Sequence, residues 1–227
     1  NLILSNKSLR TNLDFMAGSM DVHTLVITST VPEESKSNVA INLALTLAES
    51  GKKVALVDCD LRKPVLHRYL KAGHNVKGVS NVLSNQCTLD EALQELKEMN
   101  MTFLPAGTPP PNPSEMLSQP QMQAMVNTLR EKFDVVIFDA PPVSVVTDAA
   151  VIGRYVDGAV FVVRSDYAPA DAVRGAVKKL QDAGVRVLGS VLTRYDMKKA
   201  LKGSSYAYSY AYNYNYAYEK QKADVVE

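Results

Sequence analysis

Short runs of apolar and β-branched residues alternate along the chain with longer segments of helical periodicity, and this alternation most constrains the fold. The run Val135–Phe138 contains no polar residue, which is typical of a strand covered on both faces. Strands separated by helices predict a mostly parallel sheet, and right-handed crossovers then place helices on both faces. We therefore expect an α/β, doubly wound fold, in which ligands bind at the carboxyl ends of the strands.

The expected elements are spread over most of the chain. Strands are expected at Leu25–Thr28, Val54–Val57, Thr102–Leu104, Val135–Phe138, Ala159–Val163 and Val187–Leu192, the last two with both faces covered. Helices are expected at Ser37–Ser50, Leu89–Leu96, Gln121–Lys132 and Ala170–Ala183. The segment Gly107–Pro120 is rich in proline, so it should be a loop with a short helical turn.

The first expected strand is followed by a Lys-Ser pair that opens a helix, which is the position of a P-loop. A helix N-terminus offers backbone N–H groups and the positive end of the helix dipole to a phosphate. In this arrangement Lys36 reaches the outer phosphates and Ser37 is a ligand of Mg²⁺. The predicted nucleotide-binding residues are Pro32, Glu33, Glu34, Ser35, Lys36, Ser37, Asn38 and Arg62.

The loop lacks the glycines that usually shape a P-loop. Ser35 stands immediately before the lysine and Glu33 stands two residues earlier, where glycine would allow positive φ. A residue other than glycine in that conformation costs roughly 1–2 kcal/mol. Glu33 and Glu34 also add negative charge beside an anion site. On this segment alone, an ordinary strand–loop–helix turn is as good an interpretation as a P-loop.

Carboxylates follow two further strands. Asp58 and Asp60 leave the strand Val54–Val57, and Asp139 ends the strand Val135–Phe138. Carboxylate oxygens suit Mg²⁺ and can orient a nucleophilic hydroxyl, and Asp139 fits a Walker B position. A solvated strand end often carries Asp. However, the loop with its Lys-Ser pair and two strand ends with carboxylates, all in this order, are hard to obtain by chance. The predicted catalytic residues are Lys36, Asp58 and Asp60, and the predicted metal ligands are Ser37, Asp58 and Asp139.

Composition narrows the partners and the compartment. The formal net charge of +1 gives no global electrostatic reason to bind nucleic acid, so no nucleic-acid partner is predicted. No apolar run approaches the ~20 residues of a membrane span, and the start of the chain does not resemble a signal peptide. Cys59 and Cys87 lack metal-ligand spacing, and we expect both to be reduced in a cytoplasmic protein.

Every second residue from Tyr206 to Tyr218 is a tyrosine. A strand with one open aromatic face would aggregate, and low complexity at a terminus favours a flexible segment. Flexible hydroxyls suit phosphorylation, since each phosphate adds about −1.5 to −2 charge and several would repel one another. The alternative is a self-associating aromatic segment. The predicted phosphoacceptors are Tyr206, Tyr208, Tyr210, Tyr212, Tyr214, Tyr216 and Tyr218.

Several motifs together resemble the bacterial tyrosine kinases of capsule and exopolysaccharide synthesis, which are P-loop autokinases. The motifs are Leu9–Leu13, Val57–Pro64, Gly107–Glu115, Phe138–Pro142, Asp148–Ala149 and the terminal tyrosines. The resemblance covers nearly the whole chain and implies that ATP and Mg²⁺ are the cofactors.

The resemblance also implies roles for the predicted site residues. Lys36 would contact the β- and γ-phosphates, Ser37 would bind Mg²⁺, and Asp139 would support Mg²⁺ and the γ-phosphate. One of Asp58 and Asp60 would bind metal indirectly, and the other would accept or orient the tyrosine hydroxyl proton. Arg62 would be a structural partner of this cluster, pairing with phosphate or with the aspartates.

A domain organisation and partners follow from the same resemblance. Residues 1–22 would form a helical arm that can serve oligomerisation, residues 23–202 the P-loop kinase domain, and residues 203–227 the flexible tyrosine-rich tail. A separate membrane-anchored protein would activate the kinase. The chain would then be cytoplasmic, associated peripherally with the inner face of the cell membrane, and a homo-oligomer.

Two further parts of the chain depart from the family pattern. The oligomerisation motif has Glu, Arg and Arg at three-residue intervals, whereas this chain has Leu4, Lys7 and Arg10. Lysine lacks the bidentate geometry of arginine, so ring assembly through this motif is in doubt. Thr193 stands where relatives often have Asn for adenine contact, which weakens the expected recognition of the base.

The sequence therefore predicts an ATP- and Mg²⁺-dependent protein-tyrosine kinase that phosphorylates its own tyrosine cluster in trans and regulates capsular or exopolysaccharide biosynthesis. The glycine-less loop leaves open a catalytically impaired scaffold of the same family. A partition- or septum-type ATPase is a third interpretation, but those proteins usually carry a signature lysine near the position of Val31 and lack a tyrosine tail.

Overall fold

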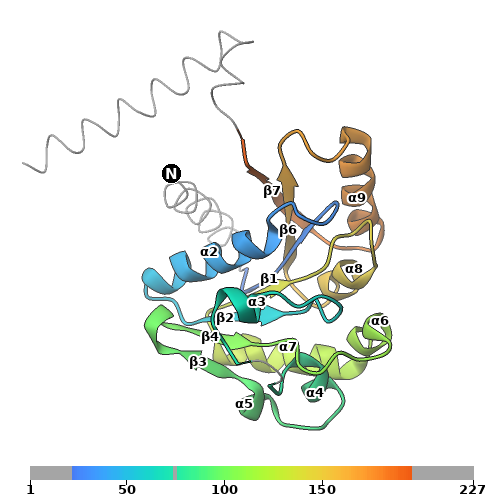
Figure 1. Cartoon of the computed structure of the whole chain (residues 1–227). Coiled ribbons are helices and arrows are strands. Elements are labelled where there is room, and N and C mark those ends of the chain that lie inside the picture. Colours follow the sequence, from blue (N-terminus) through green and yellow to red (C-terminus); the bar gives the residue numbers. More distant parts are fainter. Residues whose placement is uncertain (1–21, 74–75, 196–227) are drawn as a thin grey trace, which may run out of the picture. The chain divides into compact units, whose positions relative to one another are not determined.

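The computed structural model describes residues 22–73 and 76–195, and its central feature is one sheet (Figure 1). The strands are β1 (Thr24–Ser29), β2 (Val54–Asp58), β3 (Gln94–Leu96), β4 (Met101–Leu104), β5 (Val135–Asp139), β6 (Gly158–Arg164) and β7 (Val187–Thr193). Their order is β3-β4-β2-β5-β1-β6-β7. All neighbouring strands are parallel except β3 and β4. The predicted mostly parallel sheet is confirmed.

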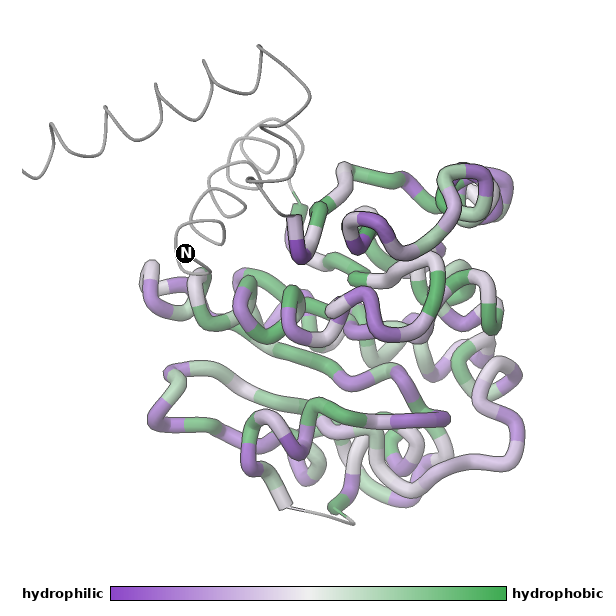
Figure 2. Tube along the Cα trace, turned by 45° about the horizontal axis from the view of Figure 1, so that its top comes forward, coloured by the Kyte–Doolittle hydropathy of each residue, from purple (hydrophilic) through white to green (hydrophobic). Residues whose placement is uncertain are grey.

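Helices cover both faces of this sheet. They are α2 (Lys36–Glu49), α3 (Leu66–Tyr69), α4 (Val79–Leu83), α5 (Leu89–Ala92), α6 (Pro113–Leu117), α7 (Pro120–Lys132), α8 (Asp148–Gly153) and α9 (Ala170–Asp182), with a 3₁₀ turn at Lys97–Met99. In Figure 2 the helices carry hydrophilic and hydrophobic residues side by side, as expected of helices with one buried face.

Two apolar cores lie on opposite faces of the sheet, because successive side chains of a strand point to opposite sides. On one face, Ile27 and Ile137 pack with residues of α2 and α3, such as Leu43. On the other face, Val26 and Phe138 pack with residues of the remaining helices. The central strands β1, β2 and β5 are buried along their whole length, as their continuous apolar sequences predicted.

The expected helix Leu89–Leu96 is wrong in its second half. Helix α5 has a capping box between Thr88 and Glu91, and it ends at Ala92. The chain then becomes extended, and Gln94–Leu96 pairs antiparallel with Met101–Phe103 of β4. The pairing satisfies the open edge of β4, which a local helical pattern cannot reveal.

The expectation that Val187–Leu192 is covered on both faces is also wrong. Strand β7 lies at the end of the strand order, and within the described residues Gly189 and Ser190 are exposed. Leu192 is 53% exposed. An apolar edge strand has the same local sequence pattern as a central one, so only the strand order distinguishes them.

The predicted arm at residues 1–22 and the tail at residues 203–227 lie, apart from Val22, outside the described residues. Within the described part of the chain, no helix combines the length and the apolar character that crossing a membrane would require.

Candidate functional site

The loop after β1 and the ends of β2 and β5 meet at the carboxyl edge of the sheet. Strand β5 lies between β1 and β2, and Asp139 at its end is level with Asp58 of β2 and Ile27 of β1. The two aspartates therefore reach the same edge on neighbouring strands, where the fold predicted a ligand site. Helix α2 begins beside them at Lys36.

The loop adopts the positive φ angles for which glycine is normally used. Glu33 has φ 65° and Ser35 has φ 71°, the two positions where the sequence lacks glycine. Ser35 is in the left-handed region as the residue that precedes α2, and its side chain makes no capping hydrogen bond to the helix. Each such residue costs roughly 1–2 kcal/mol, so this conformation must be stabilised by contacts elsewhere.

The predicted binding residues of the loop do not all face the same way. Pro32, Glu33 and Asn38 are exposed, whereas the side chain of Glu34 is buried. Lys36 and Ser37 face the strand ends. The hydroxyl of Ser37 donates to Asp139 Oδ2 at 2.6 Å.

Lys36 binds two of the predicted carboxylates. Its Nζ lies 3.2 Å from Asp139 Oδ1 and 3.5 Å from Asp60 Oδ2, and its side chain is only 11% exposed. Burial alone would lower the pKa of Lys36, but the charges of Asp139 and Asp60 raise it above its usual value. The ammonium group is therefore charged at neutral pH, as a group that binds phosphate oxygens must be.

Asp58 is fully buried, and the hydrogen bonds that its carboxylate accepts are long. Its carboxylate accepts hydrogen bonds from the N–H groups of Asp60 at 3.2 Å and Leu66 at 3.3 Å. Burial, and then the charge of Asp139, raise the pKa of Asp58 to about 8. Burial also raises the pKa of Asp139, partly opposed by Lys36 and Ser37. Among the described residues, the site thus holds more carboxylates than the ammonium group of Lys36 can neutralise.

Arg62 pairs with a residue that sequence reasoning did not assign. Its Nε lies 3.3 Å from Asp148 Oδ2, and its Nη2 donates to Ser114 Oγ at 2.8 Å. The Ser114 hydroxyl in turn donates to Asp148 Oδ1. Asp148 and Ser114 occur in motifs that carried the family resemblance, but only the fold brings them to Arg62. The Arg62 guanidinium therefore braces the segment after Asp60 against α6 and α8.

The residues present fit a magnesium–nucleotide group. Among the described residues, no group of three or more His, Cys, Asp and Glu side chains forms a ready-made metal site. Mg²⁺ in phosphate sites is instead held by one or two protein oxygens, phosphates and water. Ser37 and Asp139 supply such oxygens side by side. The hydroxyl of Thr30, at the start of the loop, is buried and finds no partner within the described part, so it is available to a phosphate oxygen.

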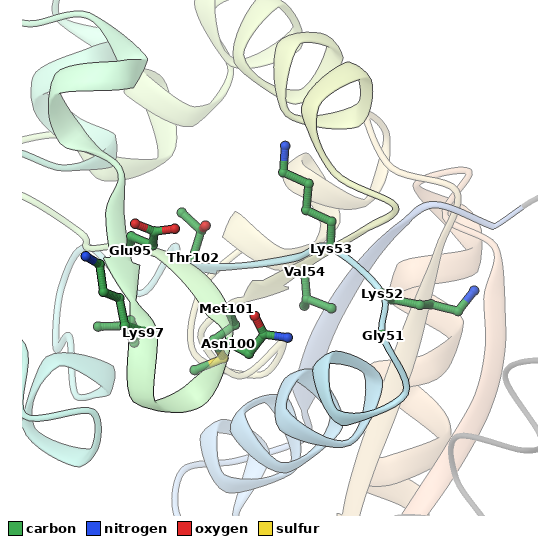
Figure 3. Close-up of a pocket in the computed structure, with 10 residues that line it drawn as sticks. Gly51, Lys52, Lys53, Val54, Glu95, Lys97, Asn100, Met101 and Thr102 are labelled. Carbon is green, nitrogen blue, oxygen red and sulfur yellow. The ribbon is translucent and has the colours of Figure 1, made fainter.

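The opposite, amino edge of the sheet contains a hollow of about 470 Å³ at the starts of β2 and β4. Lys52, Lys53 and Lys97 line it, but their side chains point in different directions and do not converge on one point (Figure 3). The hollow is therefore no counterpart of the carboxyl-edge site.

The fold and the carboxyl-edge site together define a P-loop nucleoside triphosphatase-type α/β domain. The AAA domain family matches residues 34–168, which include the Lys-Ser pair and all three aspartates. A tyrosine-protein kinase, YwqD of Bacillus subtilis, is 35% identical over 200 residues, which cover 88% of this chain and 83% of the relative.

Solved structures agree with this match. The kinase domain of the Escherichia coli tyrosine kinase ETK has a TM-score of 0.80 at 32% identity, with 83% of this chain and 73% of that chain covered. The chimerical protein CapA2B2 has a TM-score of 0.79 at 34% identity, with 84% and 83% covered. The chain belongs to the bacterial tyrosine-protein kinase family, whose members are phosphoryl transferases built on the P-loop fold.

Proposed function

We propose that this tyrosine kinase uses Mg²⁺ and ATP to phosphorylate the terminal tyrosines of a neighbouring copy, and thereby regulates capsular or exopolysaccharide biosynthesis. The observation that carries the proposal is the cluster at the carboxyl edge. There, the partly buried Lys36 lies within 3.5 Å of two carboxylates from separate strand ends, and the Ser37 hydroxyl donates to one of them. Phosphoryl transfer depends mainly on positioning and charge stabilisation, which such a cluster can supply.

Each residue of the cluster has a task in this proposal. When bound, Mg·ATP supplies the phosphoryl group and neutralises much of the local negative charge. Lys36 contacts the outer phosphates with its charged ammonium group, and Ser37 and Asp139 hold the metal. Asp58, at the end of β2 and level with Asp139 on the neighbouring strand, would take the tyrosine proton as the general base. Asp60, whose Oδ2 lies 3.5 Å from Lys36 Nζ, would orient that lysine.

The substrate proposal rests on the seven alternating tyrosines, Tyr206–Tyr218, which lie outside the described residues. A separate membrane-anchored protein would activate the kinase and bring it to the inner face of the cell membrane. The capsule-related names of several relatives, such as CapB of Staphylococcus aureus, and the chimeric CapA2B2 structure support a capsule or exopolysaccharide role and a partner of this kind.

Mixing two variants tests transfer between copies. One variant carries Lys36→Met with an intact tail, and the other has an active site but phenylalanine at every tail tyrosine. Incubation with Mg·ATP should produce phosphotyrosine on the Lys36→Met chain, identified by mass spectrometry. If the parent labels itself in a separate reaction but no phosphate appears on the Lys36→Met chain of the mixture, transfer between copies is excluded. Phosphate on Lys36→Met alone in solution would exclude the proposed role of Lys36.

A catalytically impaired scaffold is the second candidate function, and a specific observation favours it. Both positive-φ positions of the loop carry side chains, at Glu33 and Ser35, so the loop has bulk and charge in a conformation that glycine normally adopts. The double variant Glu33→Gly/Ser35→Gly separates the two functions. If the parent is inactive and the double variant forms phosphotyrosine, the chain is an impaired scaffold. If the parent is active, it is a kinase.

A further inference from the structure

The side chain of Glu34 is turned into the protein and away from the proposed phosphate site. The residue is only 1% exposed, although it lies between the exposed Glu33 and the partly exposed Ser35. Its Oε2 accepts a hydrogen bond from the N–H of Val31 at 2.8 Å, and its Oε1 accepts one from the N–H of Arg164 at 3.2 Å. One carboxylate therefore joins the start of the loop to the end of β6.

The main chain around Glu34 is tied to the same strand ends. The hydroxyl of Thr193, the last residue of β7, donates to the carbonyl oxygen of Glu34 at 2.9 Å. The guanidinium of Arg164 donates to the carbonyl oxygen of Glu33 at 3.3 Å. Four hydrogen bonds thus hold residues 31–34 to each other and to β6 and β7.

These contacts flank the two strained positions. Glu33 and Ser35, immediately before and after Glu34, have φ 65° and φ 71°. Such angles persist in residues other than glycine only where the surroundings fix them. Charge-assisted hydrogen bonds from backbone N–H groups to a buried carboxylate are among the stronger contacts available for this purpose.

We propose that Glu34 is a positioning residue that holds the glycine-less loop in its phosphate-binding conformation. The inference rests on the proposed function, because it assigns Glu34 to the nucleotide site of the kinase. It also assigns Thr193 a different task from base contact, since the Thr193 hydroxyl secures the loop. Glu34 acts through the loop and does not touch the nucleotide.

Two substitutions that remove the same charge should have opposite effects on the affinity for Mg·ADP. In Glu34→Gln, the amide NH₂ faces one of the two N–H groups and cannot accept from it, so affinity should fall roughly tenfold. In Glu33→Gln, an exposed negative charge near the phosphates is lost, so affinity should rise about two- to threefold. Titration calorimetry measures both. Equal changes in the same direction would show that Glu34 acts only through its charge, and would overturn the proposal.

Glycine should make Glu34 less necessary. In a Glu33→Gly/Ser35→Gly background the loop reaches positive φ without strain, so Glu34→Gln should then weaken Mg·ADP binding by no more than about twofold. An undiminished tenfold loss in that background would overturn the positioning role. Glu131→Gln, at an exposed position of α7, is the control that should leave affinity unchanged.

Hydrogen exchange distinguishes a failure of this inference from a failure of the proposed function. In the nucleotide-free protein, Glu34→Gln should speed exchange of the Val31 and Arg164 amides at least tenfold, whereas Glu131→Gln should not. If Glu34→Gln speeds this exchange while the parent binds no nucleotide, the brace is supported and the kinase proposal is refuted. Unchanged exchange of both amides in Glu34→Gln would refute the brace, whatever the parent binds.

Discussion

Asp134, immediately before strand β5, and Asp139, its last residue, lie in contrasting surroundings. At the amino end, the carboxylate of Asp134 accepts a short hydrogen bond of 2.7 Å from the N–H of Lys53. At the carboxyl end, Asp139 is fully buried beside Asp58, and burial raises the pKa of both. The amino edge thus satisfies its carboxylates with donors, whereas the carboxyl edge crowds them together.

Asp157, just before β6, shows the amino-edge arrangement in full. Its Oδ2 accepts from the N–H groups of His23 and Thr24 at 2.8 and 2.7 Å, and its Oδ1 pairs with Arg130 at 2.6 Å. Burial alone would raise the pKa of Asp157, but these donors lower it below its usual value. The contrast indicates that the amino edge contributes stability, while the carboxyl edge gives up stability for a site that binds cations and phosphates.

The largest expected effect comes from substituting, one at a time, the aspartates at the two ends of β5. Asp139→Asn should lower the rate of tyrosine phosphorylation by roughly 10²–10³-fold, because it removes a charge from the metal and from Lys36. The matched variant Asp134→Asn should leave the rate per folded molecule unchanged. Phosphotyrosine formation, normalised to the folded fraction measured by circular dichroism, gives both values. An equal loss in the two variants would mean that the edges do not divide their tasks.

Asp58→Asn should stabilise the Mg²⁺-free protein while reducing activity. A carboxyl group with a raised pKa in the folded state loses stability as pH rises from its unfolded value of 3.8 towards about 8. Asparagine removes this cost, so we expect the variant to be more stable than the parent by at most a few kcal/mol at pH 8 and by little at pH 4. Urea unfolding at the two pH values measures it. A variant less stable than the parent at pH 8 would contradict the proposed crowding.

The sequence predicted most of the carboxyl edge, because the chemistry of that edge lies in short motifs at strand ends. Lys36, Ser37, Asp58, Asp60 and Asp139 each follow or end a recognisable apolar run, and parallel topology brings such ends together. The sequence also located the two positions with positive φ, Glu33 and Ser35, because the P-loop pattern normally has glycine there.

Other features depended on contacts between residues distant in sequence. The hydrogen bonds from Thr193 and Arg164 to the loop span 159 and 131 residues. Likewise, Asp148 binds Arg62 from 86 residues away. Strand β3 exists because β4 offers it an open edge, and no local propensity encodes that opportunity.

Asp157→Asn tests the amino edge, with an expected loss of stability of about 1.5 kcal/mol. The variant removes the ion pair with Arg130. It also weakens the hydrogen bonds from two backbone N–H groups, because these bonds are stronger when the acceptor is charged. Thermal unfolding measures the loss, and Asp171→Asn, an exposed aspartate of α9, is the matched control with no expected change. Nucleotide affinity should be unaltered in Asp157→Asn, and a marked fall in affinity would show that the two edges are coupled.

The smallest expected effect is the pH dependence of that same contribution. Because the folded-state pKa of Asp157 lies below its unfolded value of 3.8, its stabilisation is complete above that value and is lost as pH falls through the folded-state pKa. The stability difference between the parent and Asp157→Asn should therefore be constant from pH 5 to 7 and shrink below about pH 4. Asp58→Asn should show the reverse trend, with a difference that grows as pH rises. Parallel pH profiles for the two variants would remove the distinction between a stabilising amino edge and a carboxyl edge under electrostatic strain.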